Sequence, residues 1–385
     1  MNNGLEFTLK FVENVCYMKL LGSFNSNTAA LFDRQFESIK SNSIVLDMEE
    51  CLFISSAGLR SLLTAYKNMT GKSGSMGIIN ISPHIRQIFE MTGFDQILDV
   101  NMSYREISID GCEFISSGVC GECFRLDPET IVKLYGEGIS VEIAEKEKKL
   151  SKAAFILGVP TAISYDVISC KGRFGVVYEM IDAQLFSAII REDLKNISKH
   201  AVTLSKITKS VHAIKGDKNI FPDIKDKFRE YIEQMSLFLS SDDISYLRMK
   251  LEQLPDSEQC VHFDLHTSNI MIKNNEPIII DMGDFSIGSY LFDLGLAYMI
   301  YGIPELKFSE LATKIPADKG KELWNHFVKD YFLDKTNEEF KFFDNNKYFL
   351  ASLRIIYTIT FLPKLRNELS TILKEFLLPK MKATS

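Results

Sequence analysis

The sequence lacks the features that would place it in several specialised classes of protein. It contains 7 cysteines in 385 residues, an odd number that is scattered along the chain. A chain of this length does not need disulfide bonds for stability, so we expect reduced thiols. No apolar run approaches the ~18 residues of a membrane-spanning helix, and residues 1–10 have neither the basic start nor the apolar run of a signal peptide. We therefore expect a cytoplasmic protein without a membrane partner.

Excess positive charge is also missing. Lysine and arginine number 44 against 51 acidic residues, and no basic run of the kind that binds nucleic acid is present, so we expect no nucleic-acid partner. Residues 341–385 are the exception, with 8 basic and 3 acidic side chains. Cys120 and Cys123 have the CxxC spacing of a zinc site, but no second pair of ligands lies nearby, and we expect no metal there.

What the sequence does contain is an ordinary globular composition, 46% apolar and 25% charged, over a length that allows two or three domains. Residues 1–101 alternate short strands with helices, which predicts a small α/β domain. A turn around Asn14 joins the first two strands. The predicted strands are Leu5–Phe11, Val15–Leu21, Ile44–Met48, Gly77–Ile81 and Ile97–Val100.

A different pattern of predicted secondary structure begins after a polar joint at 101–105. The chain is rich in strands as far as Asp182 and mostly helical afterwards, apart from one hairpin near 270–281. One long helix, Val141–Leu157, interrupts the strands. A strand-rich lobe followed by a helical lobe predicts a ligand-binding cleft between them. The predicted strands are Ile107–Ile115, Cys123–Leu126, Thr130–Tyr135, Ala162–Val167 and Gly175–Met180.

The hairpin region carries the strongest chemical signal. Two apolar runs, Ile270–Lys273 and Ile278–Asp281, flank a turn and should pair, which brings Asn269 and Asp281 together. Asp264 lies on the loop that feeds the same end. Because Mg²⁺ prefers carboxylate and amide oxygens, we expect Asn269 and Asp281 to hold this metal and Asp264 to accept the proton of an attacking hydroxyl. The alternative is a solvated acidic hairpin.

Two further patterns support this prediction. Gly118 and Gly121 lie in a turn between strands, where backbone N–H groups can face phosphate oxygens. Lys133 stands inside an apolar strand, and a carboxylate on a core-facing stripe needs such a partner. We expect that carboxylate to be Glu147, although it could instead reach solvent from the edge of the stripe. Glu147 shares its helix stripe with Ile143, Leu150, Ala154 and Leu157.

This ordered series resembles an aminoglycoside/choline-kinase-type phosphotransferase with the protein-kinase-like fold, over residues 105–385. The resemblance implies an N-lobe at about 105–182, a C-lobe at about 183–385, and ATP as the phosphoryl donor. It also implies that Glu179 and Ile181 belong to a hinge that binds the nucleotide.

The sequence departs from this family's pattern at two positions. Ser116 stands where the first glycine of the phosphate-binding loop is usual, and Phe263 replaces the small glycine common between the histidine and Asp264. No residue that the family's chemistry requires is missing, which favours an active enzyme.

A second resemblance covers residues 1–101. A strand runs into Ser55 and Ser56, which begin a helix. A serine there can cap the helix, or it can carry a phosphate, because a helix N-terminus tolerates negative charge. Together with the segments 22–25 and 82–86, this loop resembles STAS domains of the anti-sigma factor antagonist type. The resemblance implies that an anti-sigma factor kinase phosphorylates Ser56, although Ser55 and Asn25 replace acidic residues that are usual in the family.

The sequence thus predicts an α/β STAS domain followed by an α+β protein-kinase-like two-lobed domain. We expect an ATP- and Mg²⁺-dependent kinase that phosphorylates a hydroxyl of a small molecule or a protein. The alternative is a regulatory protein that senses nucleotide and titrates an anti-sigma factor. The basic C-terminal end would repel a polycationic aminoglycoside, which favours a neutral or anionic alcohol or a protein serine.

Overall fold

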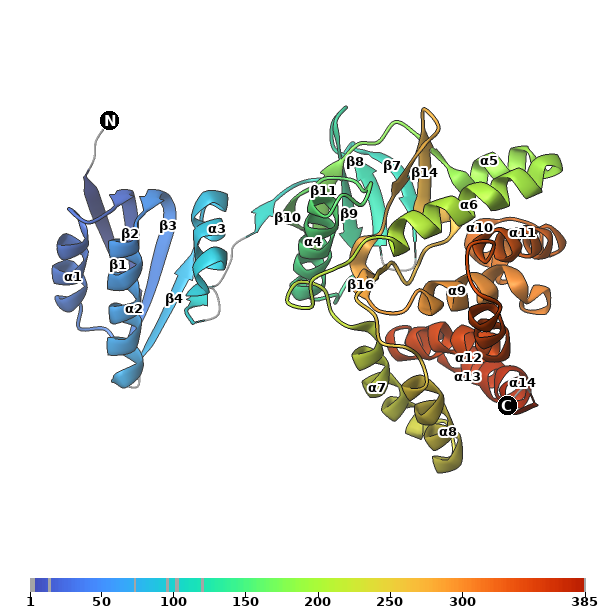
Figure 1. The fold of residues 1–385 in the computed structure, drawn as a ribbon. Coiled ribbons are helices and arrows are strands. Elements are labelled where there is room, and N and C mark those ends of the chain that lie inside the picture. Colours follow the sequence, from blue (N-terminus) through green and yellow to red (C-terminus); the bar gives the residue numbers. More distant parts are fainter. Residues whose placement is uncertain are drawn as a thin grey trace. The chain divides into compact units, whose positions relative to one another are not determined.

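The structure is a computed structural model that describes residues 4–12, 15–72, 74–94, 97–100, 104–118 and 121–383. The chain forms two compact units, Met1–Glu106 and Ile107–Ser385 (Figure 1). The predicted turn around Asn14 and most of the predicted joint at 101–105 lie outside the described residues.

The first unit is a sheet with the strand order β1-β2-β3-β4-β5, in which β1 and β2 are antiparallel and the later pairs are parallel. Its core is built by alternate residues of the central strands, among them Met18, Leu20 and Leu46, together with Phe32 and Leu62 from helices. The elements are β1 (Leu5–Val12), β2 (Val15–Phe24), α1 (Ala29–Glu37), β3 (Ser43–Ile54), α2 (Ser56–Gly71), β4 (Ser75–Ile79), α3 (Pro83–Thr92) and β5 (Asp99–Val100).

Strand β3 is longer than the sequence predicted. The expected strand Ile44–Met48 continues to Ile54, because β3 stays paired with β2 as far as Phe24, through two shifts in register. Acidic residues at 49 and 50 interrupt the apolar pattern, but both are exposed, so they do not oppose the pairing. The extension delivers the chain directly to the start of α2.

The second unit begins with an antiparallel sheet in which β10, β11, β9, β8 and β7 are neighbours in that order. The predicted strand Ile107–Ile115 is wrong: the strands described in this part of the chain are β6 (Arg105–Glu106) and β7 (Glu113–Ser117). Gly111, with φ +82°, turns the backbone between them, which an extended strand does not allow. The others are β8 (Gly121–Arg125), β9 (Thr130–Tyr135), β10 (Ser164–Cys170) and β11 (Arg173–Glu179).

Helix α4 (Val141–Ile156) packs beside this sheet. Its buried face runs through Ala144, Glu147, Leu150 and Ala154 at helical spacing. The predicted apolar stripe is therefore wrong at its two ends, because Ile143 and Leu157 are 45% and 37% exposed. Glu147 is only 4% exposed and lies on the buried face, as predicted.

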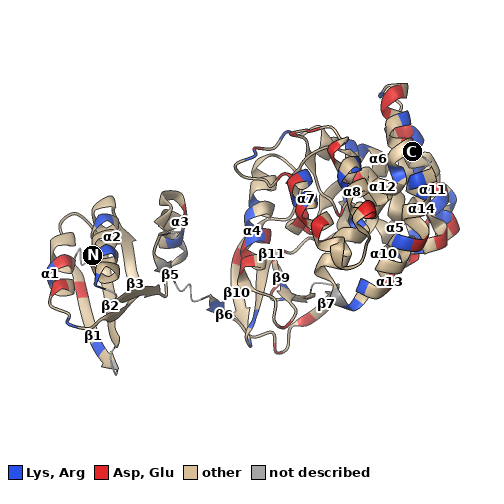
Figure 2. Ribbon diagram, turned by 90° about the horizontal axis from the view of Figure 1, so that it is seen from below, with Lys and Arg blue, Asp and Glu red and all other residues tan. Residues whose placement is uncertain are grey.

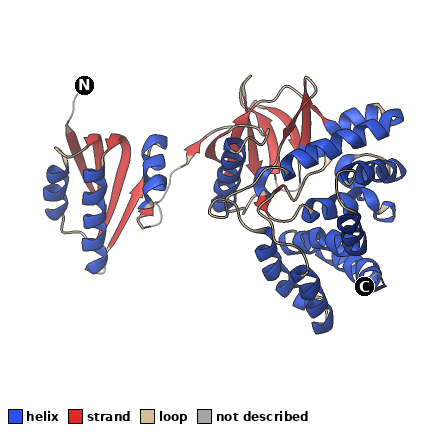
Figure 3. Ribbon diagram, in the orientation of Figure 1, coloured by secondary structure: helices blue, strands red, loops and turns tan. Residues whose placement is uncertain are grey.

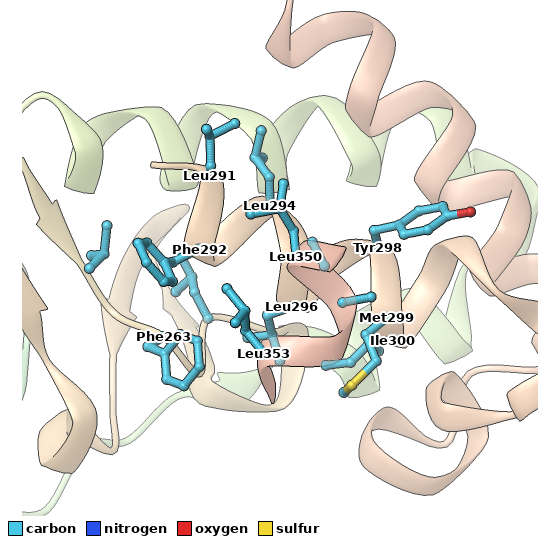
Figure 4. Packing of buried hydrophobic residues seen from close by; sticks show 14 of the residues in the cluster. Phe263, Leu291, Phe292, Leu294, Leu296, Tyr298, Met299, Ile300, Leu350 and Leu353 are labelled. Carbon is cyan, nitrogen blue, oxygen red and sulfur yellow. The ribbon is translucent and has the colours of Figure 1, made fainter. Parts of the chain in front are cut away.

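The rest of the unit is mainly helical, with a few short strands between the helices (Figure 3). Its large core joins α6 to α11 and α9 to α12, and Figure 4 shows Leu294 and Leu296 of α9 near Leu350 and Leu353 of α12. The helices are α5 (Phe186–Glu192), α6 (Ile197–His212), α7 (Ile224–Gln234), α8 (Ser241–Glu252), α9 (Leu291–Ala297), α10 (Phe308–Thr313), α11 (Ala317–Tyr331), α12 (Asn337–Phe361), α13 (Arg366–Thr371) and α14 (Leu378–Ala383).

The predicted hairpin is present as β14 (Ile270–Lys273) and β15 (Glu276–Ile279). In the view of Figure 2, acidic and basic residues are interspersed along the helices of this unit. None of the helices in the described part of the chain combines the length and the apolar character that crossing a membrane requires.

Candidate functional site

Lys133 is at the centre of the candidate site. It lies on β9 and its Nζ donates to both carboxylate oxygens of Glu147, at 2.9 and 3.0 Å, and to Oδ1 of Asp281 at 2.8 Å. Burial lowers the pKa of Lys133, but the two carboxylates outweigh burial and hold the pKa well above its usual value. The predicted pair of Lys133 with Glu147 is thus formed, and a third residue from a distant segment completes it.

Glu147 is held by more than Lys133. The hydroxyl of Tyr178 donates to Oε1 at 2.7 Å, and the hydroxyl of Tyr135 donates to Oε2. Each oxygen of this buried carboxylate therefore accepts a charged and a neutral hydrogen bond. Such full satisfaction fixes the side chain, because rotation would leave a buried charge unpaired.

The hairpin positions Asn269 and Asp281. Ile270 pairs with Ile279, and the Ile280 N–H donates to the Asn269 carbonyl at 3.0 Å, so Asn269 and Asp281 flank the same end of the hairpin. Asp281 has φ +65°, a left-handed conformation that is uncommon for a residue other than glycine. Burial raises the pKa of Asp281, but the ion pair with Lys133 outweighs burial and lowers it overall.

Asp264 is brought against Asn269. The Asn269 side-chain amide donates to the Asp264 carbonyl at 2.9 Å and to its Oδ2 at 3.0 Å. Asp264 is partly buried, with 22% of its side chain exposed. The predicted trio of Asp264, Asn269 and Asp281 is therefore assembled at one end of the hairpin.

Two histidines shape the loop from 262 to 269. His262 is fully buried and its Nδ1 accepts from the Asp264 N–H at 3.2 Å, while Nδ1 of His266 accepts from the Ser268 N–H at 3.2 Å. Burial lowers the pKa of His266. His266 thus shapes the loop through a local hydrogen bond.

The buried carboxylate of Asp293 binds the backbone of this loop. Asp293 on α9 accepts from the His262 and Phe263 N–H groups at 2.9 and 2.6 Å, and from Nε2 of His212 at 2.9 Å. Burial raises the pKa of Asp293, but its bond to His212 outweighs burial and lowers it overall. His212 was not among the predicted site residues, because its partner Asp293 lies on a helix that is distant in the sequence.

The glycine turn joins β7 to β8. The Gly118 N–H donates to the Gly121 carbonyl at 2.8 Å, and residues 119 and 120 lie outside the described part of the chain. A Cβ on Gly121 would lie 2.3 Å from the Leu134 carbonyl oxygen, so only glycine fits there against β9. The structure leaves open space around Gly118.

The predicted hinge follows β11. The Glu179 carboxylate accepts from the Ile163 N–H at 2.8 Å, and the Glu179 N–H donates to the Ile163 carbonyl at 3.0 Å. Ile181 is half-buried, and its carbonyl accepts from the Ala183 N–H at 3.1 Å. The side chain of Glu179 is therefore used to attach the hinge to the start of β10.

Ser56 lies in the first unit, as the first residue of α2, and is exposed. Its neighbour Ser55 is the N-cap, and Ser55 Oγ accepts from the Gly58 N–H at 3.4 Å. Ser55 thus caps the helix, whereas Ser56 is exposed and makes no capping bond. Leu52 and Phe53, just before them, are 72% and 43% exposed.

Arg354 was not among the predicted site residues. This residue lies on α12, and its Nη2 is 2.8 Å from Oδ1 of Asp264. A lone arginine within the apolar run from 349 to 363 was a usable signal, of the same kind as Lys133 in its strand. Tyr135 and Tyr178 gave no signal, because a tyrosine in a strand usually serves packing alone.

Among the residues that the structure describes, no group of three or more His, Cys, Asp or Glu side chains is arranged to hold a metal. Cys120 of the CxxC pair lies outside them. A metal at the hairpin would therefore depend on the amide oxygen of Asn269 as well as on carboxylates.

Comparison with known proteins gives matches to both units. The model of the STAS domain matches residues 6–107, and the model of the phosphotransferase enzyme family matches residues 114–313. The anti-sigma F factor antagonist of Paenibacillus polymyxa is 23% identical over 101 residues, which cover 25% of this chain and 86% of that protein.

Two solved structures are similar to the second unit. One is APH(2'')-IIa in a ternary complex with streptomycin and ATP, 19% identical, covering 70% of this chain and 93% of that chain with a TM-score of 0.48. The other is an ethanolamine kinase of Plasmodium vivax, also 19% identical, covering 72% of this chain and 85% of that chain with a TM-score of 0.48.

Proposed function

Because the chain belongs to the phosphotransferase enzyme family, we propose that it transfers the γ-phosphoryl group of ATP to a hydroxyl group of a small molecule or a protein. The observation that carries this proposal is the assembly of Lys133, Glu147 and Asp281 beside a loop on which Asn269 is bonded to Asp264. Phosphoryl transfer needs little more from a protein than positioning and charge neutralisation, and these residues can supply both.

Lys133 would hold the phosphates of ATP. Its ammonium group is held between the carboxylates of Glu147 and Asp281 by two ion pairs. The backbone of the turn at Gly118 and Gly121 would cover the phosphates, and the hinge at Glu179 and Ile181 would contact the base. The attachment of Glu179 to Ile163 supports this role, because it holds the hinge backbone in place.

The side chains at the hairpin fit Mg²⁺. Asn269 uses its amide N–H groups on Asp264, which directs its amide oxygen elsewhere, and Asp281 uses Oδ1 on Lys133. An amide oxygen and one carboxylate oxygen are thus available, and both are ligands that Mg²⁺ prefers. When bound, Mg²⁺ would neutralise charge on the phosphates.

Asp264 would act as the base. Its carboxylate takes the proton of the acceptor hydroxyl while that oxygen forms a bond to the γ-phosphorus. The bond from this phosphorus to the bridging oxygen breaks, and ADP leaves with the electron pair. Asn269 holds Asp264 at the geometry that this transfer needs.

We propose a regulatory role for the STAS domain at residues 6–107. Ser56 is exposed at the N-terminus of α2 and lies near the exposed Leu52 and Phe53, so a phosphate there would alter a surface suited to a protein partner. The relative in Paenibacillus polymyxa supports an anti-sigma factor as that partner. The second candidate function is a protein that binds nucleotide without turnover and acts through this surface.

One experiment separates the two functions. Isothermal titration with ATP, with and without Mg²⁺, measures nucleotide binding, and transfer of labelled γ-phosphate to a library of hydroxyl compounds measures catalysis. The kinase predicts Mg²⁺-dependent binding and a labelled acceptor. Binding without transfer to any compound or to protein serine would favour the regulatory function. Because residues 341–385 are basic, we expect a neutral or anionic acceptor.

A further inference from the structure

The guanidinium of Arg354 connects helix α12 to the loop that carries Asp264. Its Nη2 lies 2.8 Å from Oδ1 of Asp264, and its Nη1 donates to the Phe263 carbonyl at 3.0 Å and to Oδ2 of Asp284 at 3.2 Å. Burial lowers the pKa of Arg354, but the two carboxylates outweigh burial and raise it, so the side chain stays charged. One side chain thus contacts the base, the backbone beside it and a second carboxylate.

Phe263 is the residue whose backbone Arg354 contacts, and it is strained. Its φ is +61°, a region that a bulky side chain rarely adopts and that costs about 1–3 kcal/mol. The ring packs edge-on against Phe228 and Tyr357, and Figure 4 shows it beside Phe292. The Arg354 guanidinium lies over the same ring, 5.2 Å from its centre. Arg354 therefore contacts both the carbonyl and the ring of this strained residue.

Arg354 is itself held in place by Tyr357 and Asp284. The Tyr357 hydroxyl donates to Oδ1 of Asp284 at 2.6 Å, and the guanidinium lies 4.7 Å from the centre of the Tyr357 ring. Only 15% of the Arg354 side chain is exposed. These contacts restrain the planar guanidinium, which lowers the cost of ordering it for catalysis.

Each carboxylate oxygen of Asp264 has a different partner. Oδ1 faces Arg354, and Oδ2 accepts from Asn269. Rotation of the carboxylate would break one of these contacts, so together they set its plane. Within the described part of the chain, Arg354 forms no hydrogen bond with Lys133 or Glu147, and it reaches Asp281 only through the field of its charge. Substitution of Arg354 should therefore affect the orientation of Asp264 more than the side chains that would hold the nucleotide.

We propose that Arg354 is a positioning residue for phosphoryl transfer: it orients the Asp264 carboxylate and stabilises the strained Phe263 backbone next to it. This inference rests on the proposed function, in which Asp264 is the base. Arg354 acts through Asp264 and needs no contact with the acceptor or with ATP.

The test compares Arg354→Met, which keeps the apolar stem, and Arg354→Lys, which keeps the charge without the fork. Activity is labelled phosphate transfer to an acceptor that the wild-type protein accepts, or to water. A misplaced group can cost about 100-fold in rate, so we expect Arg354→Met to lower kcat by about that factor, with KM for Mg-ATP changed by less than about threefold. The kcat of Arg354→Lys should lie between those of the wild-type protein and Arg354→Met. Millimolar methylguanidinium should restore part of the kcat of Arg354→Met.

The control is Arg366→Met, because Arg366 on α13 is also half-buried and lies over an aromatic ring, that of Phe238, but does not contact the loop. It should keep the wild-type kcat. A folded Arg354→Met variant with wild-type kcat would overturn the inference. If that variant does not fold, wild-type kcat in Arg354→Lys would overturn it instead. Absence of transfer and hydrolysis in the wild-type protein would refute the proposed function first.

Discussion

Lys133 and Asp281, 148 residues apart in the sequence, form a 2.8 Å ion pair that joins strand β9 to the segment after the β14–β15 hairpin. The same ammonium group holds the buried Glu147. The strand-rich and helical parts of the second unit are therefore linked through one cation at the candidate site. The stability and the ligand binding of this unit should depend on the same side chain.

Replacing Lys133 by methionine tests this link. The change leaves Glu147 as a buried carboxylate without a cation, and breaking a buried pair in this way costs about 3–5 kcal/mol. We expect a loss of this order in the free energy of unfolding, measured with urea, and a loss of Mg-ATP binding in calorimetry. The double variant with Glu147→Gln should regain part of the stability and none of the binding. A double variant less stable than Lys133→Met would contradict the assignment.

The glycine turn makes a second prediction with its own control. Gly121→Ala places a Cβ 2.3 Å from the Leu134 carbonyl oxygen, so β8 must move away from β9. We expect Gly121→Ala to destabilise the protein by about 1–3 kcal/mol and to weaken nucleotide binding. Gly118→Ala meets open space and should fold normally. Equal melting temperatures of the two variants would show that the close approach is unimportant.

Lys227 on α7 predicts an unusual dependence of stability on pH. Burial, with the nearby charge of Lys146, lowers the pKa of Lys227 to about 8, although Asp284 opposes the shift. Between pH 8 and 10.5 the unfolded chain binds the proton more tightly, so stability should rise with pH in this window. Below pH 8 the folded state bears the full cost, about 3 kcal/mol.

The measurement is urea unfolding of the wild-type protein and Lys227→Met from pH 7 to 10.5. The wild-type protein should gain stability relative to the variant as the pH rises, and most of the gain should fall above pH 8. Lys149→Met, an exposed position on α4, is the control and should show a constant difference. A difference between wild type and Lys227→Met that does not change with pH would refute the shifted pKa.

The two serines at α2 should respond differently to substitution. Ser55→Ala removes the N-cap and should cost about 1 kcal/mol of stability, whereas Ser56→Ala removes no cap and should cost less than about 0.5 kcal/mol. Ser56→Asp places a negative charge in the first turn, which the helix dipole favours by about 0.3–1 kcal/mol. Thermal unfolding of the full chain measures all three. A larger loss for Ser56→Ala than for Ser55→Ala would reverse the roles assigned to the two serines.

Phosphorylation of Ser56 has its own test. After the full chain is incubated with Mg-ATP, mass spectrometry measures whether the peptide that contains Ser55 and Ser56 carries a phosphate. A phosphate on Ser56 would identify the attached kinase domain as a source. An unmodified peptide would exclude the attached kinase domain as the source of a phosphate on Ser56.

Much of the site was predictable because its signals are local. Asn269 and Asp281 are brought together by a short hairpin, and Lys133 and Glu147 each stand out as a charge on an apolar face. Ser55 and Ser56 were likewise predicted to begin a helix, because one strand leads directly into that helix. Such patterns need no knowledge of distant contacts.

What the sequence could not predict depends on tertiary contacts. β3 extends to Ile54 because β2 is long enough to pair with it, and Arg354 reaches Asp264 only because α12 packs against α9. The strand expected at Ile107–Ile115 failed for a local reason, since Gly111 turns the backbone between two apolar stretches. Tyr178 became part of the site through its place opposite α4 in the sheet.

The role of Asp264 as the base is tested most directly by measuring Mg-ATP binding and phosphate transfer in Asp264→Asn, with Asp166→Asn on β10 as the control. We expect Asp264→Asn to bind Mg-ATP within about threefold of the wild-type affinity, while its transfer rate falls by about 100-fold or more, because the base is lost and the nucleotide contacts remain. Asp166→Asn should retain both. An unchanged rate of transfer in Asp264→Asn would show that Asp264 is not the base.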